Sequence, residues 1–404
     1  MVKRERYLAK LRLLRGARLI KIITGIRRCG KSTLFVQFQQ ELLRSGVKPK
    51  NILSINLEEM ENEALLDRHV LHTHILKNCA PGRKNYVFLD EIQNVPNFEK
   101  LVDSLFVKPY IDLYLTGSNA NFLSSDLATL LTGRCVEIRM LPFSFAEFAQ
   151  NAPAARNQTE LFEDFILYGG FPEASNMLNS RAKSQINNYL TGIYSAILEN
   201  DIMKRKKIRS RFDFENLFRF MLDSVGSLVS PNNIAGTLAK NGQKINKQTV
   251  ENYLQYLADG FLLTDVRRYD IKGKKLLQTL GKYYVADTGL LLAVLGRHAQ
   301  VNRGHLLENL IYLELARRYK NVFVGKAAAA EVDFVCQDEN GLLGYYQVAL
   351  TVRQENTLAR ELAPLNRLND HFPKYLLTLD PEEPTHNGIR QLNVINWLLQ
   401  EEQS

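Results

Sequence analysis

Cysteine is scarce in this sequence. The 404 residues contain four cysteines, Cys29, Cys79, Cys135 and Cys336, and no two of them form a Cys-x-x-Cys pair. Structural zinc sites need clustered thiolates or histidines, and a disulfide framework needs many cysteines at regular spacings, so the scattered set excludes both. Free thiols are typical of a reducing compartment, and the cytoplasm is the simplest expected setting.

Long apolar runs are also absent. No stretch of about eighteen consecutive apolar residues occurs, so no membrane span is predicted. Lys3, Arg4 and Arg6 make the beginning of the chain basic, but no apolar segment of the signal-peptide kind follows them. With 45% hydrophobic and 24% charged residues, the composition is that of an ordinary globular protein, and the length predicts two or three domains.

Acidic residues are under-represented in one part of the chain. The formal net charge is +9, and residues 201–282 contain 16 Lys and Arg against 8 Asp and Glu, which leaves +8 in that window. A local basic excess suggests nucleic acid or another anionic partner. The alternative is a solvated charged face, and the sequence leaves both open.

The strongest motif lies between residues 19 and 40. A β-branched, apolar run ends at Gly25, and a helical apolar pattern begins after Gly30, Lys31 and Ser32. Strand, glycine-rich turn and helix form the setting of a phosphate-binding P-loop, in which backbone N–H groups and the positive helix end surround a triphosphate. Lys31 would reach the β- and γ-phosphates, and Ser32 would bind Mg²⁺. The alternative is a chance glycine-rich turn. The predicted nucleotide-binding residues are Gly25, Ile26, Arg27, Arg28, Cys29, Gly30, Lys31, Ser32 and Thr33.

A second motif follows about sixty residues later. The apolar run from 86 to 89 leads directly into Asp90 and Glu91, as expected for a buried parallel strand whose carboxyl end opens at the ligand edge of a sheet. This is the pattern of a Walker B element. We expect Asp90 to hold Mg²⁺ through its water shell and Glu91 to polarise the attacking water.

Two further strands complete the expected sheet. Residues 112–115 lead into Ser118 and Asn119, which would either sense the γ-phosphate or cap the following helix. Arg134 precedes a fifth strand, 136–140. Together with the strands at 19–24, 52–57 and 86–89, these segments alternate with helices and predict an α/β fold with a five-stranded parallel sheet.

The ordered set of motifs resembles one family across nearly the whole chain. The segments that carry the resemblance are GIRRCGKSTL, YVFLDEIQNV, YLTGSN, LLTGRCVEIRMLPFSFAEF, YGGFPEA, SPNNIA, KYYVADTGL, LLENLIYLEL and EVDFV. They are similar to those of bacterial and archaeal AAA+-type P-loop ATPases that carry a C-terminal nuclease-like domain of uncharacterised role.

This resemblance implies further features. It places the strand that contains Thr116 between the P-loop strand and the Asp90 strand. Arg134 matches an arginine finger, which acts on a neighbouring subunit's nucleotide and implies a homo-oligomer; the alternative is a salt bridge within the subunit. Residues 144–200 match a helical lid, in which Pro172 lies near the nucleotide. The alternative at Pro172 is a plain helix-breaking turn.

Residues 201–282 predict a winged helix. A basic cluster at 204–211 precedes three helical segments, 212–224, 232–240 and 246–258, and then two strands. Lys247, Gln248, Asn252 and Gln255 would lie on the recognition helix, with three lysines between 272 and 275 on the wing. DNA binding is one interpretation of this segment, and a protein-contact module is the other.

Residues 283–404 predict a degenerate nuclease-like α/β domain of the PD-(D/E)xK class. Glu308 in a helix and Asp333 in a strand match two metal-binding carboxylates. The two remaining positions contain Gln347 and Ala349, which supply neither the third carboxylate nor the lysine. We therefore expect a nuclease fold without nuclease activity.

The sequence thus predicts four segments: an ATPase core (1–143), a lid (144–200), a winged helix (201–282) and the nuclease-like domain (283–404). The expected function is Mg²⁺-dependent ATP hydrolysis coupled to movement of a DNA- or partner-binding C-terminal half. The alternatives are a nucleotide-gated switch with little turnover and a DNA-cleaving effector.

Overall fold

The computed structural model of the chain describes residues 2–120, 133–153, 156–206, 208–240, 242–243, 245–296, 301–327 and 330–400, without the side chains of residues 278 and 279. It divides into two compact units. The first consists of residues 1–140 with 259–261, and the second consists of residues 141–258 with 262–404.

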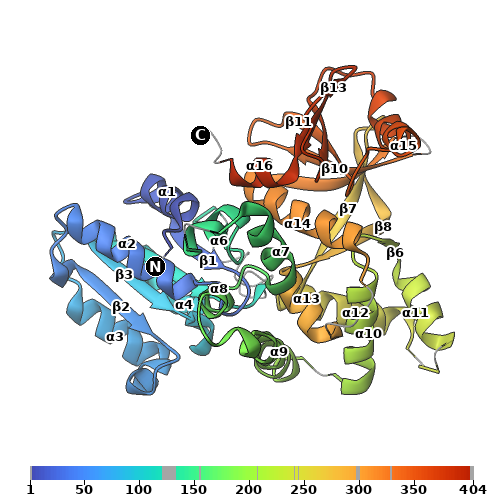
Figure 1. Cartoon of the computed structure of the whole chain (residues 1–404). Coiled ribbons are helices and arrows are strands. Elements are labelled where there is room, and N and C mark those ends of the chain that lie inside the picture. Colours follow the sequence, from blue (N-terminus) through green and yellow to red (C-terminus); the bar gives the residue numbers. More distant parts are fainter. Residues whose placement is uncertain are drawn as a thin grey trace. The chain divides into compact units, whose positions relative to one another are not determined.

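The first unit alternates helices and strands (Figure 1). Its strands end at the polar motifs that the sequence singled out. In chain order its elements are α1 (Glu5–Leu14), β1 (Ile20–Thr24), α2 (Lys31–Arg44), η1 (Pro49–Asn51), β2 (Ile52–Asn56), η2 (Met60–Leu66), α3 (Arg68–Asn78), β3 (Asn85–Asp90), η3 (Ile92–Asn94), α4 (Phe98–Phe106), β4 (Ile111–Gly117) and β5 (Cys135–Arg139).

The five strands form one sheet in the order β2-β3-β4-β1-β5, and all four neighbouring pairs are parallel. The expected five-stranded parallel sheet is therefore confirmed, with the Thr116 strand between β1 and β3. Parallel strands bring their carboxyl ends to one edge, so the chain after Thr24, Asp90 and Gly117 meets there.

Alternation along the strands supplies a core on both faces of this sheet. On one face, Val87 and Leu113 pack with α3 and α4. On the other face, Phe88 and Tyr114 lie toward α2. Their rings are stacked with centroids 4.7 Å apart, and the ring centroid of Phe35 in α2 is 5.0 Å from that of Phe88. Figure 1 shows α2 and α3 on opposite sides of the sheet. Because both faces are covered, the central strands β1, β3 and β4 are buried at every position, and the charged residues within β1 and β4, Lys21 and Asp112, pair with each other.

The second unit begins with a helical segment. It comprises α6 (Phe145–Asn151), α7 (Gln158–Tyr168), α8 (Pro172–Leu178), η5 (Lys183–Gln185), α9 (Ile186–Ala196) and a π-helical turn (Ile197–Met203). Three further helices, α10 (Arg211–Asp223), α11 (Pro231–Lys240) and α12 (Lys247–Asp259), occupy the part predicted as a winged helix.

The strands of this unit form one nine-stranded sheet in the order β13-β14-β12-β11-β10-β9-β7-β8-β6. Its elements are β6 (Leu228–Val229), β7 (Leu263–Asp270), β8 (Lys275–Val285), α13 (Thr288–Leu295), α14 (Arg303–Arg318), β9 (Asn321–Ala327), β10 (Ala330–Gln337), β11 (Leu343–Val348), α15 (Glu355–Asn366), β12 (Lys374–Thr378), β13 (Thr385–His386), β14 (Ile389–Asn393) and α16 (Val394–Leu399).

The strands expected to form a wing are part of this larger sheet. β7 and β8 form the expected antiparallel pair, but β7 also pairs in parallel with β9 through Arg268 and Val324. The expected boundary between residues 282 and 283 therefore lies inside β8, and the hairpin is continuous with the strands of the C-terminal segment.

We find no helix in the described ranges that combines the length and the apolar character required to cross a membrane.

Candidate functional site

The turn after β1, predicted to bind phosphate, has glycines in left-handed conformations at both of its ends. Gly25 has a φ of +147°, and a Cβ atom at this position would lie 2.1 Å from the carbonyl oxygen of Met140, so only glycine fits. Gly30, with a φ of +106°, precedes α2 and lets the chain turn into the helix. Ile26 and Cys29 are buried beneath the loop, whereas Arg28 is exposed.

Lys31 lies at the centre of this loop. Its ammonium donates to the carbonyl oxygens of Gly25 at 3.1 Å and Ile26 at 3.4 Å, and its Nζ is 3.6 Å from Oε1 of Glu91. The side chain is 4% exposed. A buried ammonium surrounded by acceptors is positioned to exchange them for phosphate oxygens.

Asp90 and Ser32, the two residues predicted to bind Mg²⁺, are in hydrogen-bond contact with each other. Asp90, at the end of β3, accepts hydrogen bonds from the hydroxyl groups of Ser32 and Thr116. Burial raises the pKa of Asp90, and these hydrogen bonds oppose the rise. A carboxylate and a hydroxyl oxygen side by side form a donor set that suits a hard cation such as Mg²⁺.

Glu91 is held in an unusual backbone conformation beside Lys31. Its φ is +53°, a left-handed conformation that is uncommon outside glycine and often marks a functional position. Its backbone N–H donates to Oγ1 of Thr116 at 2.9 Å. Burial by itself would raise the pKa of Glu91, but the charge of Lys31 and hydrogen bonds from Gln93 and Ser118 lower it. The carboxylate is therefore ionised at neutral pH and able to accept a proton.

Gln93 is a site residue that the sequence analysis missed. Its side-chain amide donates to Oε2 of Glu91 and, at 3.3 Å, to Oγ of Ser118. Its carbonyl oxygen is buried and has no hydrogen-bond partner among the described residues. Because ionised Glu91 can only accept hydrogen bonds, the NH₂ group must face it, and the unpartnered acceptor is the oxygen. The sequence signal that could have identified Gln93 is its position, two residues after Glu91.

Ser118 and Asn119 are buried at the end of β4, beside this network. Ser118 contacts Glu91 and Gln93, as a γ-phosphate sensor would. The residues that follow, 121–132, lie outside the described residues, so both interpretations stay open.

The N-terminal segment contacts the loop from beneath. Arg4, just before α1, is 2% exposed and donates from Nη1 to the carbonyl oxygen of Cys29 at 3.0 Å. Its backbone N–H donates to Gln37 of α2 at 3.2 Å. No sequence motif identifies this contact, which helps to hold the loop in its conformation.

Arg134 lies at the opposite edge of the sheet. Its carbonyl oxygen accepts a hydrogen bond from the N–H of Ile20, at the start of β1, at 2.8 Å. Its side chain pairs with Asp103 of α4 and lies over the ring of Phe106 at 5.5 Å. The salt bridge considered as an alternative is thus present, and Arg134 does not face the P-loop of its own subunit.

Pro172 is the first residue of α8 in the second unit. The two residues before Phe171, Gly169 and Gly170, must be glycine because a side chain would clash at either position. A Cβ atom on Gly169 would lie 1.9 Å from Oδ1 of Asp287, and one on Gly170 would lie 2.4 Å from the carbonyl oxygen of Phe143. Asp287 accepts from the N–H of Gly170 at 2.6 Å, and burial raises the pKa of this carboxyl to about 6.

A second charged cluster lies in the second unit. Glu308 is on α14 and Asp333 on β10, as predicted, and the ammonium of Lys282 lies between them. Lys282 Nζ is 2.8 Å from Glu308, 2.8 Å from Glu331 and 3.9 Å from Asp333. Tyr284 donates to Glu308 at 2.6 Å. Burial, followed by the charge of Glu308, raises the pKa of Asp333 to about 8.

The two degenerate positions have other roles. Gln347 accepts from the backbone N–H of Asp333 at 3.3 Å and donates to Glu361 at 3.0 Å. Ala349 packs against the apolar cluster around Val335. Among the residues that the structure describes, no group of three or more His, Cys, Asp or Glu side chains is arranged to hold a metal ion. The motif did not indicate Lys282, because it places its lysine in the strand that carries Gln347.

Comparisons with known proteins identify related domains and chains. Residues 17–149 match the family described as an AAA domain, and residues 159–301 match a domain of unknown function, DUF8612. The chain resembles the solved structure of the Walker-type ATPase paby2304 of Pyrococcus abyssi, with a TM-score of 0.53 and 18% identity over 73% of this chain and 96% of that one. At that identity, the likeness concerns the fold.

Two relatives match the chain over most of their length. An uncharacterised protein of Haemophilus influenzae is 37% identical over 99% of both chains. The uncharacterised protein MJ1544 of Methanocaldococcus jannaschii is 30% identical over 90% of this chain and 82% of its own length.

The fold and the AAA-domain match define the first unit as a P-loop domain of the AAA+-like ATPase class. The whole chain belongs to the family that contains the Haemophilus influenzae and Methanocaldococcus jannaschii proteins.

Proposed function

We propose that this protein is an Mg²⁺-dependent ATPase whose hydrolysis cycle moves a DNA- or partner-binding C-terminal half. The observation that supports this proposal best is the convergence of Lys31, Asp90 and Glu91 at the carboxyl edge of one parallel sheet. Phosphate binding, metal binding and proton acceptance each have a suitable side chain there.

In this proposal each residue has a separate task. The loop from Gly25 to Thr33 would bind the phosphates through its N–H groups, and Lys31 would neutralise the β- and γ-phosphates. Ionised Glu91 would take a proton from a water molecule. The water oxygen bonds to the γ-phosphorus as the bond to the β–γ bridging oxygen breaks, and ADP leaves with that electron pair.

Ser32 and Asp90 would hold Mg²⁺, which would offset the negative charge of the phosphates. Ser118 and Asn119 would orient the γ-phosphate. Arg134 would act on a neighbouring subunit after leaving Asp103; the exposed pair contributes little to stability, so this exchange costs little. Pro172 would close over the nucleotide.

Steady-state ATP turnover tests the proposal, measured with Mg²⁺ and with EDTA, and with and without duplex or single-stranded DNA. Metal-dependent turnover would support it. ATP binding with negligible turnover in all conditions would favour the nucleotide-gated switch. We expect turnover, because ionised Glu91 lies beside Lys31.

We expect Gln93→Ala to lower kcat by about 10- to 100-fold, a part of the 10²–10⁴ that a positioned general base supplies. Gln93 orients Glu91, and its unpartnered oxygen is placed to accept a hydrogen bond from the attacking water. KM should change much less. Gln39→Ala, which removes an amide that donates to Ser54 on the edge strand β2, is the matched control. Equal turnover in the two variants would contradict this role.

We expect salt-sensitive, largely sequence-independent DNA binding through residues 201–282. Lys272 and Lys274 are exposed in the β7–β8 turn. Changing both to Gln should make the slope of log affinity against log salt shallower by about 0.9 for each lost phosphate contact. The equivalent change at exposed Lys48 and Lys50 is the control. An unchanged slope, or no binding at low salt, would leave the basic window as a solvated face.

A further inference from the structure

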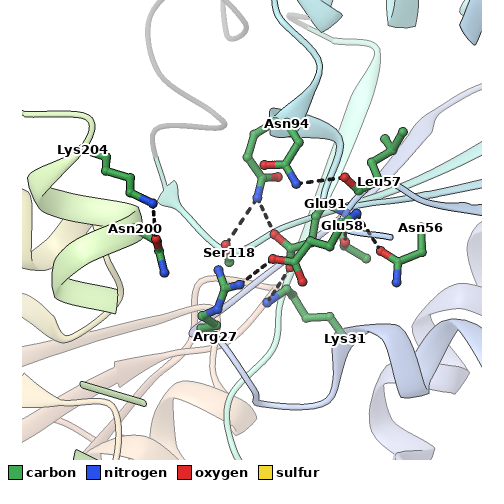
Figure 2. A network of polar contacts seen from close by, with 12 residues as sticks. Arg27, Lys31, Asn56, Leu57, Glu58, Glu91, Asn94, Ser118, Asn200 and Lys204 are labelled. Atoms are coloured by element: carbon green, nitrogen blue, oxygen red, sulfur yellow. Dashed lines mark hydrogen bonds and ion pairs between the residues drawn. The ribbon is translucent and has the colours of Figure 1, made fainter. Parts of the chain in front are cut away.

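Arg27 places a second cation at the phosphate-binding edge. It is the third residue of the P-loop, and its guanidinium donates to Glu58 at 2.5 Å. Figure 2 shows Arg27 directed toward Glu58, with Lys31 and Glu91 in the same network. The side chain of Arg27 is 23% exposed, and its charge contributes to the lowered pKa of Glu91. A cation in this position lies where Lys31 and Glu91 would meet a γ-phosphate.

Glu58 is held by the segment that carries Glu91. The neighbouring Leu57 donates its N–H to the carbonyl oxygen of Asp90 at 3.1 Å and accepts from Asn94 at 3.3 Å. The N–H of Glu58 itself donates to Asn56 at 3.1 Å. These contacts hold the backbone of Glu58, whose carboxylate faces Arg27 of the phosphate loop. A triphosphate entering the loop would be repelled by Glu58 and attracted by Arg27.

We infer that Arg27 is a catalytic arginine that acts within its own subunit: Glu58 holds its guanidinium until the γ-phosphate of ATP replaces the Glu58 carboxylate. This inference rests on the proposed ATPase function. A guanidinium can donate two parallel hydrogen bonds, and either a carboxylate or a phosphate can accept them. Arg27 therefore stays paired when the γ-phosphate replaces the Glu58 carboxylate. In the hydrolysis step, Arg27 stabilises the charge that develops on the γ-phosphoryl oxygens.

The exchange also supplies a signal. When Arg27 leaves Glu58, the segment from Asn56 to Glu58 loses its ion pair to the P-loop, and this segment is hydrogen-bonded to Asp90 and Asn94. ADP has no γ-phosphate and would leave the Arg27–Glu58 pair intact. The site thereby distinguishes ATP from ADP.

The test measures ATP and ADP affinities and single-turnover hydrolysis for four variants in the full-length chain. Arg27→Ala should weaken ATP binding by about 10- to 100-fold, the scale of a charge-assisted contact, and leave ADP binding unchanged. Its hydrolysis rate should fall by about 100- to 1,000-fold, with partial recovery in Arg27→Lys. Glu58→Gln should bind ATP up to about fivefold more tightly, whereas Glu59→Gln, the matched control, should not.

Each other outcome has a distinct meaning. If Arg27→Ala loses ADP and ATP binding equally, Arg27 holds the loop together and the inference fails. If the wild type hydrolyses ATP and Arg27→Ala keeps its rate and its ATP-to-ADP preference, the inference fails and the proposed function stands. A wild type that binds neither nucleotide overturns both. Arg27→Ala mixed with Lys31→Ala should recover no activity, and recovery would show an arginine acting between subunits.

Discussion

Glu91→Gln is expected to bind ATP as tightly as the wild type and to hydrolyse it at least about a hundredfold more slowly, the usual minimum contribution of a general base. Glutamine has nearly the same shape as glutamate but cannot accept the proton of the attacking water. Because Glu91 is buried and ionised beside Lys31, its neutralisation removes the base without removing the phosphate-binding groups.

Lys31→Ala tests ATP binding, whereas Glu91→Gln tests hydrolysis. It removes the ammonium that the P-loop carbonyl oxygens surround, so ATP binding itself should be lost. Equilibrium binding and steady-state turnover of both variants make the comparison, with Glu63→Gln, an exposed glutamate of η2, as the charge-matched control. Normal turnover in Glu91→Gln would refute the Walker B assignment. Retained ATP binding in Lys31→Ala would instead remove the P-loop assignment.

The part of this site that could be predicted follows from strand geometry. A continuous apolar run before Asp90 indicates a buried parallel strand, and parallel strands deliver their ends to one edge. That reasoning brings Asp90 and Ser118 to the P-loop without any knowledge of the side-chain contacts. The same reasoning gives the five-stranded sheet, whose strands begin and end within a few residues of the expected positions.

The missed residues depend on contacts that no local pattern encodes. Gln93 reaches Glu91 because the chain turns through a left-handed residue into η3. Arg27 was among the predicted nucleotide-binding residues, but its partner Glu58 was not, because the two residues are 31 positions apart and meet through two different loops. In the second unit, the pairing of β7 with β9 makes the expected wing part of a larger sheet, because residues around 268 and 324 become neighbours only after folding.

The cluster around Lys282 bears on the expected lack of nuclease activity. Divalent cations need closely spaced carboxylates with open coordination positions. Here the ammonium of Lys282 lies 2.8 Å from both Glu308 and Glu331 and is itself buried. Ala349 supplies no cation of its own. Purified protein with Mg²⁺ or Mn²⁺ should therefore leave plasmid and single-stranded DNA intact. Cleavage that disappears in Asp333→Ala would contradict this expectation and would mean that another side chain replaces the missing lysine.

Lys282→Met should destabilise the second unit by about 3–5 kcal/mol, because it removes the counter-charge of buried Glu308 and of half-buried Glu331, both 2.8 Å from the ammonium. Thermal unfolding measures the loss, with Lys320→Met as the control, since Lys320 and its partner Glu339 are both exposed. The same variant tests whether the ammonium replaces a metal ion. Millimolar Mn²⁺ should raise the unfolding temperature of Lys282→Met by binding the released carboxylates, and should leave the wild type unchanged. Equal Mn²⁺ stabilisation of both proteins would show that the wild-type cluster already binds metal, and a stability like that of the control would show that Lys282 does not neutralise it.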